Sequence, residues 1–239
     1  MRDATTTRLA WAGVVLGLAS LLLLMVSAYG YRQDWWPVLQ ALDVAAWGAW
    51  AALAGTLAAL AALANRARRG RGGFAVALLG LVLSLPVLTM AAGWEYATRT
   101  TPAINDISTD TENPPVFWFT VTPTDYPAKN AAPQHAAYPE VRPLDLALSF
   151  DDAYAAALAL VEERGWKVLS ADPAESQIEA IATSRLYGFE DEVAVRVAET
   201  DGGVRIDMRS RSRLGQIDRG ANARRIESFL SDLKSRAEN

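Results

Sequence analysis

The sequence predicts three transmembrane helices followed by a soluble domain of the α+β class. Residues 1–94 contain three long apolar runs, whereas residues 95–239 contain short strand-like alternations between two amphipathic helical segments. The net charge also changes, from +4 over residues 1–94 to −8 over residues 95–239. We therefore expect a membrane domain over residues 1–94 and a soluble domain over residues 95–239.

Each of the three apolar runs is long enough to cross a bilayer. Residues 9–28 are uncharged, and about 20 helical residues match a hydrocarbon core of about 30 Å. The second run, residues 44–64, is rich in alanine, and its small residues allow close helix packing. The third run, residues 74–94, contains Pro86, which we expect to kink the helix without ending it. The small residues of the second run include Gly48, Ala52, Gly55 and Ala59.

The end of the first run allows a second interpretation. The small residues around Ser27 and Ala28 resemble a cleavage site, which would make the first run a removable signal peptide. The run is long for a signal peptide, and two further runs follow it. We therefore favour an uncleaved anchor.

Loop charges predict the orientation in the membrane. The loop after the second run is the most basic short loop of the chain, and the positive-inside rule assigns such loops to the cytoplasm. Aromatic residues cluster at the opposite boundary, as is typical of a headgroup layer. We expect a multi-pass protein of the bacterial inner membrane, with a cytoplasmic N-terminus and a periplasmic C-terminal domain. The basic loop contains Arg66, Arg68, Arg69 and Arg71, and the aromatic cluster contains Tyr29, Tyr31, Trp35, Trp36, Trp94 and Tyr96.

Residues 101–143 hold eight of the eleven prolines of the chain. This density excludes a regular helix and makes long central strands unfavourable. Apolar residues such as Ile104, Ile107 and Phe117 are nevertheless too frequent for a solvated linker. We expect an extended strap, residues 101–143, that lies over the soluble domain.

The remaining pattern predicts a helix, four antiparallel strands and a second helix. Ser149 and Asp152 resemble a capping box, and Gly165 suits a left-handed residue after a helix end. Asp218 is a suitable N-cap for a final helix that runs to about Ser235. Strands are expected over residues 166–170, 177–185, 192–200 and 204–212, with a hairpin turn at 201–203. Apolar and charged residues alternate in the last two strands, so we expect both helices on one apolar face and a charged opposite face.

Composition limits the possible chemistry. The chain has no cysteine, and its single histidine, His135, rules out a multi-histidine metal site. Residues 105–112 offer oxygen atoms at alternate positions, but the stretch lacks the glycine at the sixth position and the glutamate at the twelfth position of a calcium loop. Ser210 and Ser212 have no evident general base. We therefore assign no catalytic residue, cofactor or metal.

The most informative stretch is rich in arginine. Residues 196–225 contain eight arginines and four acids, a net charge of +4, so the rest of the soluble domain carries −12. Arginine suits bidentate recognition of carboxylate or phosphate, and glycines beside a helix start let backbone amides approach an anion. We hypothesise a binding site in this region. Its candidate residues are Asn105, Asp106, Asp110, Arg196, Arg209, Ser210, Ser212, Arg213, Asp218, Asn222 and Arg225.

A structural role competes with this hypothesis. The arginines can instead pair within the domain, and the acids available for this are Glu179, Asp191, Asp207 and Asp218. Asn222 shares the buried stripe of the final helix, so we expect the backbone of the strap to satisfy its amide. We also expect at least one of Arg209 and Arg213 to pair with acids of the strap, because these acids need counter-charges nearby.

Three stretches together resemble the bacterial and chloroplast family known as domain of unknown function 1499. They are residues 102–117, residues 188–197 and the motif Arg-Ser-x-Ser-Arg-x-Gly-x-x-Asp-x-Gly-x-Asn-x-x-Arg-Ile over residues 209–226. The resemblance covers about residues 100–236. Family members often carry two consecutive aspartates where this chain has Asp191 and Glu192. The resemblance implies that the strap and the arginine-rich stretch form one unit, and it implies no established activity.

Three functions follow from these observations. The first is a membrane-anchored binding or scaffold module for a small anionic ligand or for a membrane or envelope protein; we expect the lipid bilayer as a partner and no nucleic acid. The second is an enzyme for a phosphorylated or acidic envelope substrate that uses Asp106 or Asp110 with Arg209 and Arg213. The third is a structural subunit held by its helices. We favour the first, because the chain lacks a motif with assigned chemistry.

Overall fold

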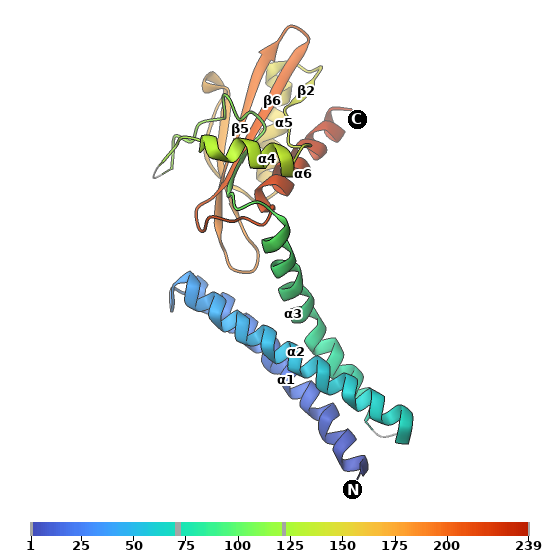
Figure 1. Ribbon diagram of the computed structural model, residues 1–239. Coiled ribbons are helices and arrows are strands. Elements are labelled where there is room, and N and C mark those ends of the chain that lie inside the picture. Colours follow the sequence, from blue (N-terminus) through green and yellow to red (C-terminus); the bar gives the residue numbers. More distant parts are fainter. Residues whose placement is uncertain (1, 70–72, 121–122, 239) are drawn as a thin grey trace. The chain divides into compact units, whose positions relative to one another are not determined.

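The computed structural model describes residues 2–69, 73–120 and 123–238 (Figure 1). The chain divides into two compact units, Met1–Tyr96 and Ala97–Asn239. Long apolar helices precede an α+β unit with an antiparallel sheet, which confirms the predicted fold class.

The helices of the first unit match the predicted apolar runs and extend beyond them. They are α1 (Arg2–Arg32), α2 (Val38–Arg69) and α3 (Phe74–Thr100), and α3 continues unbroken through Pro86 into the second unit. Among the described residues, three segments are long and apolar enough to cross a membrane: Ala4–Arg32, Val38–Asn65 and Phe74–Thr100. Of the basic loop that predicts the orientation, Arg71 and the side chains of Arg66, Arg68 and Arg69 lie outside the described residues.

Small residues let these helices pack closely. A Cβ atom added at Gly80 of α3 would lie 2.9 Å from the backbone carbonyl carbon of Gly13 on α1. A Cβ atom added at Gly55 of α2 would lie 2.6 Å from the Oγ atom of Ser84 on α3. Such short distances mean that the helices approach each other until only glycine fits. Gly55 belongs to the small residues from which the sequence predicts close packing.

The second unit is built on one antiparallel sheet. In its described residues the sheet has six strands. Five of them pair in the order β1-β6-β5-β4-β3, and the sixth, β2, pairs with β6. The strands are β1 (Asp106–Ser108), β2 (Leu144–Leu146), β3 (Lys167–Asp172), β4 (Gln177–Thr183), β5 (Glu190–Thr200) and β6 (Gly203–Ser212). The helices are η1 (Ala128–Asn130), α4 (Ala131–Ala137), α5 (Phe150–Glu163), η2 (Pro173–Glu175) and α6 (Ala221–Ala237).

Local sequence signals explain the ends of α5. The Oγ atom of Ser149 accepts a hydrogen bond from the backbone N–H of Asp152 at 3.2 Å and donates to its Oδ2 atom at 2.7 Å. The first bond is the N-cap bond that a capping box predicts, whereas the second joins the two side chains instead of returning to the backbone N–H of Ser149. Gly165, just beyond the other end, has a φ of 68°, a conformation that favours glycine.

Three details differ from the sequence prediction. The strands β1 and β2 were not predicted, because strands of three residues between prolines are too short to show alternation. The strap contains α4, so the prediction that the proline density excludes a regular helix is wrong; Pro133 lies in the first turn of α4, where its missing N–H has no partner within the helix. The final helix begins at Ala221 rather than at Asp218, and Gly220 occupies the N-cap position with a φ of 75°.

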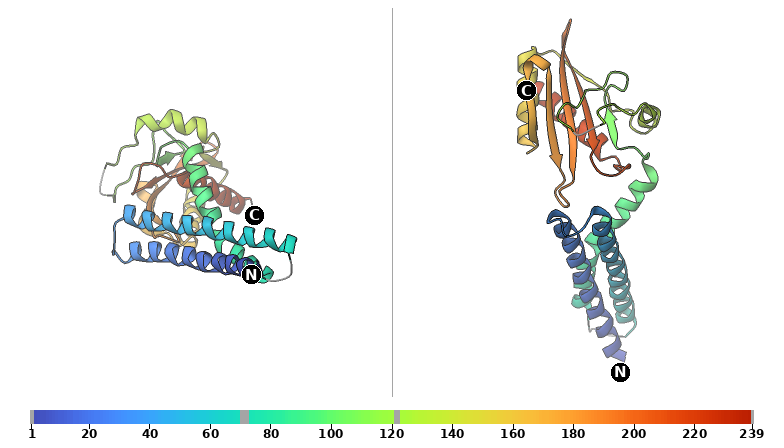
Figure 2. Two further views of the ribbon diagram at one scale, coloured as in Figure 1. Left: turned by 60° about the horizontal axis from the view of Figure 1, so that its bottom comes forward. Right: turned by 90° about the vertical axis from the view of Figure 1, so that its left-hand side faces the viewer.

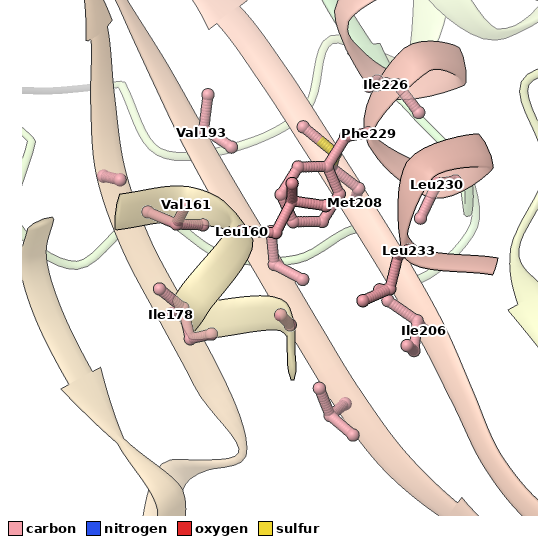
Figure 3. Packing of buried hydrophobic residues seen from close by; sticks show 14 of the residues in the cluster. Leu160, Val161, Ile178, Val193, Ile206, Met208, Ile226, Phe229, Leu230 and Leu233 are labelled. Atoms are coloured by element: carbon pink, nitrogen blue, oxygen red, sulfur yellow. The ribbon is translucent and has the colours of Figure 1, made fainter. Parts of the chain in front are cut away.

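The hydrophobic core lies between the sheet and the two helices α5 and α6. Figure 3 shows Leu160 and Val161 of α5 with Phe229 of α6 above side chains of the sheet. Figure 2 shows α5 on one side of the sheet and the strap with α4 on the other. The sheet contributes Ile178, Ala180, Ala182, Val193, Val195, Val197, Val204, Ile206 and Met208 to this core, as the alternation predicts.

The close helix packing predicts the effect of enlarging one glycine. Gly80→Val should lower the free energy of unfolding of the helices by about 1–3 kcal/mol, because the added atoms meet the backbone of α1. Gly93→Val on the same helix is the matched control, since a Cβ atom there would meet nothing within 4 Å. Denaturation of the full chain in detergent measures both changes, and equal stability of the two variants would contradict the packing.

Candidate functional site

Charged side chains occupy the face of the sheet that points away from the core. Successive residues of a strand point to opposite faces, so Ile206 and Met208 of β6 lie in the core while Asp207, Arg209 and Arg211 lie on the second face. The strap covers this face. The predicted open, charged surface is therefore a buried polar layer, in which Glu179, Glu192, Asp207 and Arg209 are each at most 2% exposed.

Arg209 holds the strap to the sheet. Its Nε and Nη2 atoms donate to Oδ1 and Oδ2 of Asp106 at 2.9 and 2.7 Å, which makes the ion pair bidentate. Its Nη1 atom donates to the carbonyl oxygens of Pro115 and Thr124 at 3.0 and 2.9 Å. These two residues belong to one segment of the strap, whose described residues 115–120 and 123–124 we name the strap loop. One guanidinium group therefore joins β1, β6 and both ends of the strap loop.

Phe117 is the apolar anchor of the strap loop. Its side chain is fully buried, and its ring centroid lies 4.6 Å from Cζ of Arg209 and 4.8 Å from Cζ of Arg211. Both distances are within the range of cation–π attraction. Burial of the ring and these contacts both stabilise the packing of Phe117 against the sheet.

The sheet binds the strap mainly through the strap backbone. Gln177 donates from Nε2 to the carbonyl oxygen of Val116 at 2.7 Å. Glu179 accepts the backbone N–H groups of Trp118 and Phe119 at 2.9 and 3.1 Å. Burial raises the pKa of Glu179 above its ordinary value, and these two hydrogen bonds offset only part of that effect. Thr120 donates to Glu192, which continues the series along the sheet.

The edge strand β1 is held by the side-chain amide of Gln134, which bonds the backbone of β1 as a neighbouring strand would. Gln134 of α4 accepts the backbone N–H of Ser108 at 3.0 Å and donates to its carbonyl oxygen at 2.7 Å. Tyr126 donates to the same Gln134 oxygen at 3.0 Å, and burial raises the pKa of Tyr126. The Nε2 atom of His135 on the same helix lies 3.0 Å from the Oγ1 atom of Thr111.

A second ionic cluster surrounds Asp207. This carboxylate accepts hydrogen bonds from Arg196 at 3.0 Å, from Arg205 at 3.2 Å and from Thr109 at 3.0 Å. Asp110 completes the cluster, because its Oδ2 atom lies 3.2 Å from Nη2 of Arg205. The predicted site residues Arg196 and Asp110 thus have partners inside the fold. In the described residues, no group of three or more His, Cys, Asp or Glu side chains is placed to hold a metal ion.

The other predicted site residues form a network on the opposite, core-facing side of the sheet. Asn222 is fully buried; its Oδ1 atom accepts from Ser210 at 2.7 Å and from Arg225 at 2.5 Å. Its Nδ2 atom donates to the backbone oxygen of Asn105 and to Oγ of Ser212, each at 3.0 Å. The strap backbone therefore supplies one of the four bonds of this amide, as expected, and side chains of β6 and α6 supply the other three.

Two carboxylates complete this network. Asp191 pairs with Arg225 at 2.5 Å, and burial raises the pKa of Asp191 although the guanidinium opposes the rise. Asp218 accepts the backbone N–H groups of Gly220 and Asn222 at 2.8 and 2.9 Å, so it supports the start of α6 from outside the helix. Asp218 therefore pairs with backbone amides, in contrast to the arginine pairing considered from the sequence.

A cleft of about 410 Å³ opens where the strap loop meets the ends of β5 and β6. In the cleft, Glu192 accepts from Nε of Arg211 at 2.8 Å and from Nε of Arg213 at 3.1 Å. Burial opposes the charge of Glu192, but these bonds and that from Thr120 outweigh it and lower its pKa. The cleft is lined by Asn105, Asp106, Thr120, Pro123, Asp125, Pro127, Glu192, Arg211, Ser212 and Arg213.

The structure therefore divides the candidate residues of the sequence among several groups, although Asn105, Asp106 and Ser212 also line the cleft. Asp106 and Arg209 form the buried clamp, Asp110 and Arg196 belong to the Asp207 cluster, and Arg213 lies in the cleft. The remaining five, apart from the capping residue Asp218, form the Asn222 network: Asn105, Ser210, Ser212, Asn222 and Arg225.

Several residues of these sites were not predicted. Arg211 and Glu192 line the cleft, and strand alternation could have placed both on the face of Arg209. Phe117 and Gln134 act through contacts that join residues far apart in the sequence. No local pattern predicts such contacts.

The fold and the site define a class of protein, an α+β domain with a buried arginine clamp that follows helices apolar enough to span a membrane. Residues 106–233 match the family described as protein of unknown function (DUF1499), and the chain belongs to this family. The match begins at Asp106, the partner of Arg209, and ends in α6. A search of curated proteins and a search of solved structures each return no match.

The raised pKa of Glu179 predicts a pH dependence of stability. Because this carboxyl group loses its proton more easily in the unfolded chain, deprotonation favours unfolding, and the contribution of Glu179 to stability falls as the pH rises above its ordinary pKa of 4.5. In Glu179→Gln, the melting temperature should therefore fall less with rising pH than it does in the unchanged chain. Exposed Glu175 gives the matched control, Glu175→Gln. An unchanged pH profile in Glu179→Gln would contradict the assignment.

Proposed function

We propose that this chain is a membrane-anchored binding module whose cleft binds a small anionic ligand. The observation that carries the proposal is the cleft at the ends of β5 and β6, because it brings Arg211 and Arg213 together with amide and hydroxyl groups. Guanidinium groups recognise carboxylate and phosphate through paired hydrogen bonds. The neighbouring hydroxyl groups of Thr120 and Ser212 suit a ligand that also carries hydroxyl groups.

Arg213 is the arginine best placed to meet a ligand. Its side chain is 34% exposed, whereas that of Arg209 is 1% exposed and that of Arg211 is 12% exposed. Its Nε atom donates to Glu192 and its Nη1 atom to Glu190, so these carboxylates hold the guanidinium in position. Its Nη2 atom remains to donate to a bound anion. Arg209 is excluded from this role because its contacts lie within the protein.

The proposed setting is the bacterial inner membrane, with the N-terminus in the cytoplasm and the cleft in the periplasm. The basic loop at residues 65–71 and the aromatic residues Trp94 and Tyr96 support this orientation. In this setting the ligand is an envelope anion, or an acidic group on a membrane or envelope protein.

The contacts do not favour the alternative of an enzyme that uses Asp106 or Asp110. Both oxygens of Asp106 accept hydrogen bonds from Arg209, and the side chain is 1% exposed. Asp110 has its Oδ1 atom bound by the amides of Glu112 and Asn113 and its Oδ2 atom paired with Arg205. A general acid or base needs an oxygen that reaches the substrate.

Binding can be tested with the full chain in detergent. Inorganic phosphate, glycerol phosphate and dicarboxylic acids are the probes, and thermal stabilisation is the readout. We expect at least one anion to raise the melting temperature, and Arg213→Gln to weaken its apparent affinity about tenfold or more. The effect should decrease with added salt, because the arginine is partly exposed.

Arg142→Gln is the matched control, since Arg142 is exposed, donates to the carbonyl oxygen of Pro139 and is absent from the cleft lining. This variant should bind as the unchanged chain does. If Arg213→Gln bound the anion as tightly as the unchanged chain does, the anion would bind outside the cleft. Stabilisation by cations alone would contradict the proposed ligand class.

A further inference from the structure

Two exposed leucines stand at the tips of adjacent loops of the second unit. Leu186 is 42% exposed in the turn between β4 and β5, and Leu214 is 47% exposed in the loop between β6 and α6. The first turn is stiff, because Ser184 and Phe189 exchange hydrogen bonds across it and Tyr187 stacks on Phe189 with the ring centroids 5.0 Å apart. Leu186 is therefore presented on a rigid support.

The sheet brings both loops to the end at which the chain enters the second unit. The backbone N–H of Arg213 bonds the carbonyl oxygen of Glu190, so the β4–β5 turn and the β6–α6 loop start side by side. The backbone N–H groups of Ser212 and Asp218 bond the carbonyl oxygens of Asn105 and Ile104. Residues 101–105, which lead in from α3, thus contact the same loop that carries Leu214 (Figure 1).

The β6–α6 loop is also tied directly to α3. The Nε atom of Arg219 donates to Oγ1 of Thr98, in the last turn of that helix, at 2.7 Å. If about 20 residues from Phe74 cross the hydrocarbon core, Thr98 lies about 7 Å beyond it, near the outer edge of the headgroup layer. The exposed rings of Trp94 and Tyr96 agree with this position of α3 in the membrane, because tryptophan and tyrosine rings are enriched at the membrane–water interface.

We propose that Leu186 and Leu214 form a second membrane contact, in which the two loop tips insert into the headgroup layer beside the end of α3. The short connection of residues 101–105 keeps this end of the unit close to the bilayer, so the contact forms within one molecule. Arg213 pairs with Glu190 between the loops. The contact orients the second unit on the membrane.

The chain has no cysteine, so single cysteines can report the position of each loop. Leu186→Cys and Leu214→Cys are labelled with an environment-sensitive fluorophore in the full chain, with one copy per lipid nanodisc. Gly202→Cys is the control, because Gly202 lies in the β5–β6 turn at the opposite end of the same strands. The nanodiscs contain zwitterionic lipid with a nitroxide-labelled fraction that quenches the fluorophore near the headgroups.

We expect quenching at residues 186 and 214 to exceed that at residue 202 at least twofold, with little change when salt is added. Equal quenching at the three positions would overturn the proposal. Quenching that requires anionic lipid and disappears with salt would replace it with an electrostatic contact. Blue-shifted emission without quenching would show that protein covers the leucines, and this too would overturn the proposal. Melting of each labelled variant confirms that the second unit remains folded.

Discussion

The buried ion pair between Asp106 and Arg209 is the interaction on which the second unit depends most. Two charges removed from water are costly unless their hydrogen-bonding groups are satisfied. Here the carboxylate accepts both ends of a planar fork, and the remaining guanidinium nitrogen bonds two carbonyl groups of the strap loop. Removing either partner would leave an unpaired charge between the strap and the sheet. The pair therefore favours one placement of β1 and the strap loop over alternatives.

Strand alternation explains why the arginine-rich stretch serves two structural purposes. Odd-numbered positions of β6, such as Arg209 and Arg211, meet the strap, whereas Ser210 and Ser212 meet the start of α6 through Asn222. These groups come together at the end of the sheet, where Asp106, Arg211 and Ser212 line the cleft with Arg213. There Arg213 is held by carboxylates and is partly exposed, and the proposed function rests on this combination.

Regular patterns in the sequence predicted most of the fold. The apolar runs, the capping box at Ser149, the hairpin at residues 201–203 and the alternation of β5 and β6 each depend on neighbouring residues, and each was predicted. The strands β1 and β2 and the helix α4 depend on contacts with distant residues, such as the bond between Gln134 and Ser108. The sequence indicated that the strap acids need the arginines. It did not show that side chains of the sheet bond the backbone of the strap. Nearly all residue types carry the same backbone N–H and carbonyl groups, so the sequence does not reveal which of these groups are bonded.

The central claim is that Arg209 fastens the strap loop, and amide hydrogen exchange tests it most directly. In the full chain, the amides of Trp118 and Phe119 should be protected, since Glu179 accepts both. Arg209→Lys cannot reproduce the bidentate pair and the two carbonyl bonds together. It should therefore speed exchange over residues 115–120 at least about tenfold, corresponding to about 1.4 kcal/mol, while Arg142→Lys leaves it unchanged. Unchanged protection of these amides in Arg209→Lys would contradict the account.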